Sequence, residues 1–534
     1  MTGARGACSY LGFTVTDKPE VVVDIDGDGA AAGGGGGAEA AENPFEFLGA
    51  PPPPAARPSA VNPFRNHTPA MGGVYEWCKI AVCLPLVAVR LALFGIAIGI
   101  GYVATRIALQ GWEDKENPMP KWRCRLMWIT RICARCILFS FGYHWIRRIG
   151  RPASRELAPV VVSNHISYVE PIFFFYELFP TIVASESHDA LPFVGTIIRA
   201  MQVIYVDRFS PMSRKHAVNE IKRKAACASF PHLLLFPEGT TSNGRFLISF
   251  QLGAFIPGYP VQPVIVRYPY VHFDQSWGNI SLAKLMFKMF TQFHNFMEVE
   301  YLPVVSPPDG KQVNAAQFAA QTSYAMAHAL NVLQTSHSYG DVLFLSRASE
   351  LGKDNCANYM VEMAWVESAF NISTSEAMEL LDQFLAMNPD SNGQVGIYGF
   401  LSAFGLKLSP LCEKMFRYFD VEKKGSITFR QFLIGSAHIR KQPLFWRACE
   451  AAFDQISDDA ETSQISKTRL GDILLATMSS STDHPICQLF KKFDVDNDGT
   501  ISRGDFMTCL KKYPFLLALF AANVKCDHHV ELIC

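Results

Sequence analysis

A histidine and a glutamate five positions apart are the first residues in this chain whose types and spacing suggest chemistry. His165 and Glu170 stand in the run Val-Ser-Asn-His-Ile-Ser-Tyr-Val-Glu-Pro. Imidazole titrates near neutral pH, so His165 can take a proton from a hydroxyl group and give it back. A carboxylate on the second ring nitrogen fixes the tautomer and stabilises the imidazolium that forms. The pair therefore predicts a general base and the acid that orients it.

The two side chains need a turn to meet. On a regular helix, residues five apart are separated by about 500° and do not share a face. Pro171 follows the pair and favours a break in regular helix before it. Val160–Val162 reads as a short buried strand that ends just ahead of His165. Because α/β proteins place chemistry where a strand opens into a helix, we expect the pair on such a loop.

Two further groups of polar residues follow predicted strands. Short β-rich runs alternate with helical stretches between residues 151 and 305, which predicts an α/β domain. The predicted strands are Val160–Val162, Val203–Val206, Leu233–Phe236 and Val261–Val266. Arg208 follows the second strand, and its planar fork suits a phosphate group. Glu238, Gly239 and Thr240 follow the third, as a turn whose backbone N–H groups and hydroxyl can bind polar groups of a ligand.

Two apolar stretches lie between residues 74 and 150, which we interpret as a membrane-anchoring region. Ile80–Val103 is apolar apart from Arg90 and is long enough to cross a hydrocarbon core of roughly 30 Å. Roughly a dozen large apolar side chains at about −0.5 kcal/mol each outweigh the cost of about 3 kcal/mol for the arginine. A spanning or re-entrant segment is therefore predicted, with a buried helix as the alternative.

The second apolar stretch, Leu126–Trp145, is interrupted by two arginines. Arg131 and Arg135 are four positions apart and share a helix face. This pattern favours a helix that lies in the membrane interface over one that spans.

Residues 1–73 hold glycine and proline runs with few bulky residues, which predicts a disordered tail. The tail contains two Asn-Pro-Phe tripeptides, 43–45 and 62–64. Such tripeptides can bind adaptor domains, but we interpret these two as chance matches.

The C-terminal part, residues 371–534, carries a calcium-loop motif of the EF-hand type. The predicted ligands are Asp494, Asp496, Asp498, Thr500 through its backbone carbonyl, Ser502 and Asp505. The last position is normally glutamate, and the shorter aspartate reaches the ion through one oxygen only. This predicts weakened calcium binding or a preference for magnesium. Three degenerate loops, 388–399, 420–431 and 458–469, complete four helix–loop–helix units in two pairs, joined to the α/β domain by residues 306–370.

Overall composition narrows the function classes. The net charge of −1 gives no reason to expect nucleic acid as a partner, while 49% hydrophobic against 18% charged residues favours contact with lipid. The 14 cysteines are scattered singly, without the spacing of a secreted disulfide framework. We therefore expect reduced thiols, with the α/β domain and the calcium loops facing the cytosol.

Four motifs, taken in order, resemble the PlsC-type glycerophospholipid acyltransferases. They are Asn164-His165-x4-Glu170, Tyr205-Val206-Asp207-Arg208, Leu235-Phe236-Pro237-Glu238-Gly239-Thr240 and Val261-Gln262-Pro263-Val264. The resemblance covers residues 151–305 and implies acyl transfer from acyl-CoA to a glycerolipid hydroxyl without a metal in the chemical step. The resemblance implies that His165 is the base and Glu170 its partner. It also implies that Arg208 binds the phosphate of the acceptor and that Glu238 and Gly239 help to place the acceptor. The commonest family pattern has aspartate where Glu170 stands.

The whole arrangement is an α/β acyltransferase domain with N-terminal membrane helices and an all-α C-terminal EF-hand domain. It resembles the lysophosphatidylcholine acyltransferase group, and most of all the plant lysophosphatidylethanolamine acyltransferases that carry EF-hands. The run from Asp274 to Ser281 adds to that resemblance. It implies a lysophospholipid and acyl-CoA as substrates, membrane lipids as surroundings, and calcium as a regulatory or structural ion; it does not identify a protein partner.

The resemblance leaves alternatives open. The acceptor could instead be lysophosphatidic acid or glycerol 3-phosphate. A protein of another class, a catalytically silent membrane calcium sensor, would have no need of the His165–Glu170 pair. The endoplasmic reticulum membrane is the expected location, with Golgi or endosomal membranes as alternatives.

Overall fold

The structure is a computed structural model that describes residues 61–68, 73–112, 116–270, 273–278, 280–308, 314–457, 464–478 and 483–521. The tripeptide at 43–45 and most of the predicted disordered tail lie outside these residues. The prediction is wrong for residues 61–68, which pack against the α/β domain with Phe64 only 6% exposed. The glycine and proline runs end before this segment, so the predicted C-terminal boundary of the disordered tail lies too far along the chain.

A seven-stranded sheet forms the centre of the α/β domain, in the order β1-β8-β7-β2-β5-β3-β4. Its strands are β1 (Ile146–Ile149), β2 (Val160–Ser163), β3 (Thr181–Ser185), β4 (Ile204–Val206), β5 (Leu233–Leu235), β7 (Val261–Arg267) and β8 (Met297–Tyr301). Neighbours are parallel except β7 and β8. The four predicted strands are confirmed as β2, β4, β5 and β7. The sheet begins with β1, before the predicted boundary at 151. The sequence of this edge strand does not show an apolar run, because two of its four residues are exposed arginines.

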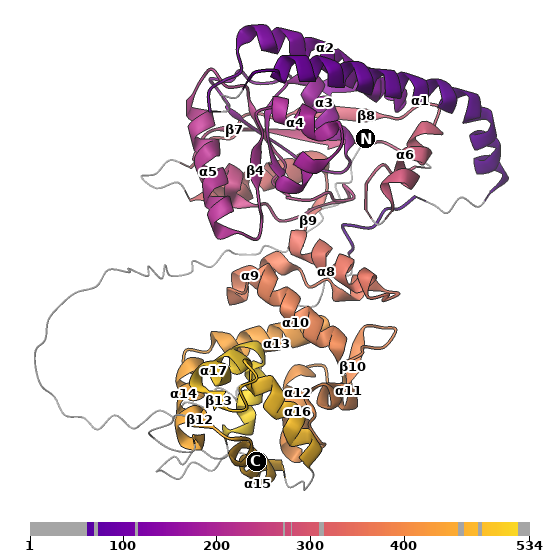
Figure 1. The fold of residues 1–534 in the computed structure, drawn as a ribbon. Helices are drawn as coiled ribbons and strands as arrows, with labels where there is room; N and C mark the ends of the chain where they lie inside the picture. Colours follow the sequence, from indigo (N-terminus) through magenta and orange to yellow (C-terminus); the bar gives the residue numbers. More distant parts are fainter. Residues whose placement is uncertain are drawn as a thin grey trace, which may run out of the picture. The chain divides into compact units, whose positions relative to one another are not determined.

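Helices cover both faces of this sheet (Figure 1). They are α3 (Val169–Glu177), α4 (Val194–Ala200), α5 (Pro211–Ala226), α6 (Leu282–Phe290) and α7 (Ala315–Leu330), with short 3-10 turns η2 (Glu186–Ala190) and η3 (Leu252–Ala254). Side chains alternate across a strand. In β2, Val161 therefore packs in one core with Phe173 of α3, while Val160 and Val162 pack in a second core with Phe318 of α7. A small parallel pair, β6 (Phe246–Leu247) with β9 (Leu333–Gln334), lies outside the main sheet.

Two long helices, α1 (Val74–Leu109) and α2 (Lys121–Ser140), lie side by side before the sheet begins (Figure 1). Among the described helices, α1 alone is long and apolar enough to cross a membrane. Arg90 lies on it but is only 3% exposed. Its guanidinium donates to the carbonyl oxygens of Phe290, Gln292 and Phe293 at the end of α6. The middle of α1 is thereby anchored to the α/β domain.

The two arginines of α2 face the protein, so the predicted interfacial position of this helix is not supported by them and stays a prediction. Arg131 donates to the carbonyl oxygens of Tyr176 and Glu177 at the end of α3, at 2.7 and 2.9 Å. Arg135 donates to the carbonyl oxygens of Tyr143 and His144. Spacing alone shows that two residues share a helix face, but not whether that face meets water or unpaired carbonyl groups of a neighbouring helix end.

The C-terminal domain is helical and begins earlier than residue 371. Its elements are α8 (Tyr339–Glu350), η4 (Cys356–Tyr359), α9 (Met363–Phe370), α10 (Thr374–Ala386), β10 (Gln394–Gly396), α11 (Ile397–Phe404), α12 (Pro410–Phe419), β11 (Ser426–Thr428), α13 (Phe429–Lys441), α14 (Phe445–Ile456), β12 (Gln464–Ile465), α15 (Lys467–Met478), α16 (Asp483–Phe493), β13 (Ile501–Ser502), α17 (Arg503–Lys512) and η5 (Pro514–Leu519). Phe344 of α8 and Val366 of α9 lie in the same core as the later helices. The connecting region is therefore shorter than predicted.

Loop pairing in this domain matches the prediction of four units in two pairs. The antiparallel strands β10 and β11 join the first two loops, and β12 and β13 join the last two. The apolar segment from Tyr513 also packs on these helices as predicted. Phe515 is buried, and its ring meets Phe400, Phe419 and Phe432.

Candidate active site

The candidate active site lies at the edge where the parallel strands end. Strands β2, β5, β3 and β4 run in one direction, so their carboxyl ends lie at the same edge of the sheet. The loop after β2 carries His165, the loop after β5 carries Glu238, and the loop after β4 carries Arg208. This is the edge at which open α/β sheets bind their ligands.

His165 and Glu170 meet as predicted. The distance from His165 Nδ1 to Glu170 Oε2 is 3.0 Å. Glu170 is the second residue of α3, and both of its carboxylate oxygens also accept the Ser167 N–H at 3.0 Å. The turn before α3 therefore brings the histidine back over the helix start, and the carboxylate holds the turn and the ring together.

Only one edge of the histidine ring is left for a substrate. Glu170 is fully buried, while the His165 side chain is 19% exposed. The imidazole stacks on the ring of Phe236, with 4.2 Å between the ring centroids. Among the described residues, Nε2 of His165 has no hydrogen-bond partner. With Nδ1 engaged by the carboxylate, Nε2 is the nitrogen that can accept a proton.

Glu238 holds the backbone of His165 from behind, and its predicted part in placing the acceptor stays a prediction. Its side chain has no exposed surface. One oxygen accepts the backbone N–H of His165 at 2.9 Å, and the other accepts the Ile248 N–H at 3.4 Å. Burial raises the pKa of the Glu238 carboxyl to about 8, against an ordinary value of 4.5. The sequence motif located the residue correctly but could not show which way the carboxyl points.

This buried carboxyl makes the stability of the domain depend on pH. Between pH 4.5 and about 8 the folded protein keeps a proton that the unfolded chain has released. Stability therefore falls as pH rises through this range, and is level below it. We expect the melting temperature to fall by roughly 5 °C between pH 6 and pH 8. Glu238→Gln, which is neutral at every pH, should flatten this dependence, whereas Glu186→Gln on the exposed turn η2 should not. An unchanged slope in Glu238→Gln would contradict the assignment.

Gly239 and Thr240 form the turn behind this carboxyl. Gly239 has a φ of +71°, a backbone conformation that favours glycine, and its N–H donates to the Phe236 carbonyl at 2.9 Å. Thr240 is half-exposed at the same edge of the sheet. Of the two, Thr240 is therefore the residue whose side chain can meet a ligand.

Arg208 is not in contact with the histidine. It follows β4, the third strand from β2 in the sheet order. At about 4.8 Å per strand this places the two chain segments about 14 Å apart. The Arg208 guanidinium lies over the ring of Tyr339, 4.3 Å from its centroid. A ligand that used both residues would have to extend along the strand ends.

Asn164 is a structural residue of the site that sequence reasoning did not single out. It is 2% exposed, and its side-chain amide both accepts the Val266 N–H at 2.8 Å and donates to the Val266 carbonyl at 3.0 Å. Asn164 thereby extends the pairing of β2 with β7 by one residue and fixes the chain just before His165. Its place beside the histidine in the first motif was the available signal.

The predicted calcium loop brings together part of its ligand set. Carboxylate oxygens of Asp494, Asp496 and Asp498 lie within 4.8 Å of one another. Thr500 donates from its hydroxyl to Asp498, which leaves its backbone carbonyl as the expected ligand. Ser502 and Asp505 instead bond each other in a capping box at the start of α17, with 2.5 Å between hydroxyl and carboxylate. The three clustered carboxylates suit a hard divalent cation.

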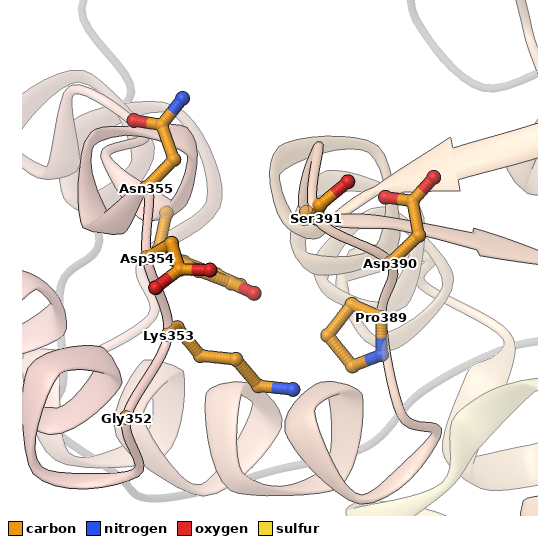
Figure 2. Close-up of a pocket in the computed structure, with 9 residues that line it drawn as sticks. Gly352, Lys353, Asp354, Asn355, Pro389, Asp390 and Ser391 are labelled. Carbon is orange, nitrogen blue, oxygen red and sulfur yellow. The ribbon is translucent and has the colours of Figure 1, made fainter.

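The first loop of the C-terminal domain contains a cavity without such a cluster. The cavity, of about 260 Å³, lies between residues 352–355 and residues 389–391. Figure 2 shows Lys353 extending toward Pro389 across the gap, with Asp390 and Ser391 on the facing wall. The Asp390 carboxylate accepts N–H groups of its own loop, from Asn392 and Gln394. Among the described residues, the acidic cluster that could hold an ion lies in the last loop, which agrees with the interpretation of this first loop as degenerate.

Lengthening the twelfth residue of the last loop tests the role of Asp505. Asp505→Glu adds one methylene, so the carboxylate can leave the capping box and reach the ion through both oxygens. We expect calcium affinity to rise about tenfold or more, measured by isothermal titration. Asp494→Ala should abolish binding at this loop. Equal calcium affinity in Asp505→Glu and the unchanged protein would contradict this account.

Comparison with known proteins agrees with this geometry. The acyltransferase family profile matches residues 149–267, and the EF hand domain profile matches residues 486–513. The chain is 59% identical to lysophospholipid acyltransferase LPEAT2 of Arabidopsis thaliana, over 90% of this chain and 89% of that one. It is 30% identical to lysophosphatidylcholine acyltransferase 2 of Mus musculus, over 85% and 77%, and 28% identical to human lysophosphatidylcholine acyltransferase 1, over 88% and 89%. With this identity and coverage, and with the His165–Glu170 pair in place, the chain belongs to the family of lysophospholipid acyltransferases.

Proposed function

We propose that the protein transfers an acyl group from acyl-CoA to the free hydroxyl of a lysophospholipid and so remodels membrane phospholipids. The observation that carries this proposal is the His165–Glu170 pair, 3.0 Å apart, at the carboxyl edge of the sheet. Lysophosphatidylethanolamine is the favoured acceptor because the motifs most resemble the plant enzymes of that class. Lysophosphatidylcholine, which names other relatives, is the second choice.

His165 serves as the general base in this reaction. Its Nε2 takes the proton of the acceptor hydroxyl as the oxygen attacks the thioester carbonyl. A carbon–oxygen bond forms, the carbon–sulfur bond breaks, and the proton passes from His165 to the departing thiolate of CoA. Glu170, on Nδ1, keeps the ring in the right tautomer and stabilises the imidazolium between the two transfers.

The remaining site residues place the substrates. Arg208 binds the phosphate of the acceptor, for which its half-buried guanidinium over Tyr339 is suited. Thr240 offers its hydroxyl at the same edge. Glu238 has a supporting role, since its bond to the backbone of His165 holds the loop on which the base stands.

The two N-terminal helices place the enzyme at a membrane. Large apolar side chains stay exposed on both: they include Val82, Val89, Ile96, Ile100, Val103 and Ile107 on α1, and Trp122, Trp128, Ile132 and Phe139 on α2. Exposed apolar surface on this scale, on a helix long enough to cross a membrane, supports a lipid contact. We assign the enzyme to the endoplasmic reticulum membrane, with the active site and the calcium loops in the cytosol. Calcium at Asp494–Asp498 then tunes activity or membrane docking.

An acyl-transfer assay on membranes tests the proposed function. Full-length protein is expressed in cells that lack this activity, and the membranes receive acyl-CoA and one of several acceptors, with or without calcium. We expect release of free CoA and a diacyl product, greatest with lysophosphatidylethanolamine. Product with lysophosphatidic acid or glycerol 3-phosphate alone would overturn the acceptor assignment. Absence of any product, together with calcium binding, would identify a silent sensor instead.

A further inference from the structure

A short N-terminal segment, residues 62–68, lies across two loops of the α/β domain, and we call it the strap. Phe64 and Asn66 of the strap are 6% and 8% exposed. The ring of Phe64 meets His337 edge-on, with 6.1 Å between centroids. The Asn-Pro-Phe tripeptide at 62–64 is therefore part of the folded domain, which excludes it as a free adaptor-binding motif in this state.

The first loop held by the strap is the turn around Asn243. The backbone N–H of Asn243 donates to the Pro63 carbonyl at 2.7 Å. Its side-chain amide donates to the carbonyl oxygens of Asn62 and Arg65, at 3.0 and 3.2 Å. Asn243 thus donates to three backbone carbonyl oxygens of the strap.

The second loop held by the strap is the run from Asp274 to Gly278. The Asn66 amide donates to the carbonyl oxygens of Asp274 and Ser276, at 3.0 and 2.6 Å. The Asp274 carboxylate, 1% exposed, accepts the His67 N–H at 2.8 Å. Gly278, with φ of +51°, approaches so closely that a Cβ there would lie 2.8 Å from the Asn66 nitrogen. The strap and this loop are therefore joined by a network of buried hydrogen bonds.

Both of these loops hold the backbone of the catalytic turn. The Ser242 N–H donates to the His165 carbonyl at 2.8 Å, and the Trp277 N–H donates to the Ile166 carbonyl at 3.1 Å. A Cβ on Gly244 would lie 2.6 Å from the Ile166 side chain, so the first loop also packs against the turn. The strap is therefore the element that ties together the two loops that fix His165 and Ile166.

We propose that the strap is a positioning element of the active site, with Asn66 as its main positioning residue. This inference rests on the proposed function of His165 as the base. The ring of His165 is set by Glu170 on one side, and its backbone by Glu238 and the two loops. Loss of the strap frees the loops from each other, and the base then spends less time aligned with the acceptor hydroxyl. A small misplacement of a catalytic group costs much of the rate without altering substrate contacts.

The test compares four variants of the full-length enzyme in membranes by kcat, KM for acyl-CoA, and melting temperature. Asn66→Ala should lower kcat about tenfold or more with KM changed less than about threefold, at a temperature where the protein is fully folded. Asn66→Asp should lose more, because a carboxylate would face two carbonyl oxygens. Thr68→Val removes the hydroxyl that donates to the Asp274 carbonyl and should lose about threefold. Arg65→Ala, an exposed side chain on the same segment, should match the unchanged enzyme.

Several outcomes overturn the proposal. One is an unchanged kcat in both Asn66 variants, and another is a loss that appears in KM alone. An equal loss in Arg65→Ala would show that any change to the segment acts through overall folding. If Asn66→Asp fails to accumulate, Asn66→Ala and Thr68→Val carry the decision. His165→Ala in the same assay separates the two proposals. An active His165→Ala variant would refute the role of His165 as the base. An inactive His165→Ala variant together with fully active Asn66 variants would refute only the positioning role of the strap.

Discussion

Replacement of His165 by alanine is expected to lower acyl transfer about 10³-fold or more, because the acceptor hydroxyl then has no base to take its proton. The protein should still fold, since the imidazole is partly exposed and contributes mainly its stacking on Phe236. The measurement is release of free CoA from acyl-CoA with lysophosphatidylethanolamine as acceptor. KM for acyl-CoA should change little, because the lost interaction belongs to the transition state.

A second histidine of the same domain provides the matched control. His188 lies on the exposed turn η2, and one of its ring nitrogens lies 3.1 Å from the Ser185 carbonyl oxygen. His188→Ala should keep full activity and the same melting temperature. Full activity in His165→Ala would refute the mechanism, and an equal loss in both variants would show that the assay reports folding rather than chemistry.

Which strands could be predicted depended on how the apolar residues of each are spaced in the sequence. β2 and β5 are central and fully buried, and each shows three apolar residues in a row; β7 is also central and buried, but Gln262 interrupts its apolar residues. β8 alternates buried and half-buried residues in Met-Glu-Val-Glu-Tyr, and β1 carries two exposed arginines. Strands with such mixed sequences are recognised by their pairing partners, which a single sequence does not display. The internal strand β3 was missed too, whereas β4 was predicted although it lies at the edge of the sheet. The position of His165 was predictable because it follows β2, a short and fully buried strand that begins with three valines.

The roles of charged residues were harder to predict than their places. Glu238 and Glu170 are both buried carboxylates beside the same histidine, yet one holds the ring and the other the backbone. The spacing of Arg131 and Arg135 predicted a shared helix face, but it did not show that Arg131 binds the end of α3. For Glu238 and Arg131 the deciding partner is a backbone group from a distant part of the chain. Backbone donors and acceptors are the same for every residue type, so no sequence pattern reveals them.

Glu170 is the residue at which this chain departs from the commonest family pattern, and the structure explains why its length matters. The carboxylate spans from helix α3 to His165 Nδ1 while also accepting the Ser167 N–H, both at 3.0 Å. Glu170→Asp withdraws the carboxylate by about 1.5 Å, one carbon–carbon bond. It can then keep one of these contacts only if the turn moves. We expect kcat to fall about 10- to 100-fold with KM for acyl-CoA unchanged.

Glu170→Gln keeps the length and removes the charge. If its amide donates to Nδ1, the proton of the ring is forced onto Nε2, the nitrogen that must act as base. Loss of the correct tautomer alone costs about 10³- to 10⁴-fold in a comparable His–carboxylate pair. We therefore expect Glu170→Gln to be less active than Glu170→Asp, measured as kcat at saturating acyl-CoA. The reverse order would mean that reach, rather than charge, limits the pair, and an active Glu170→Gln would remove Glu170 from the mechanism. The expected order follows because a moved turn can still orient the ring, whereas an amide that donates to Nδ1 leaves no nitrogen free to accept the proton.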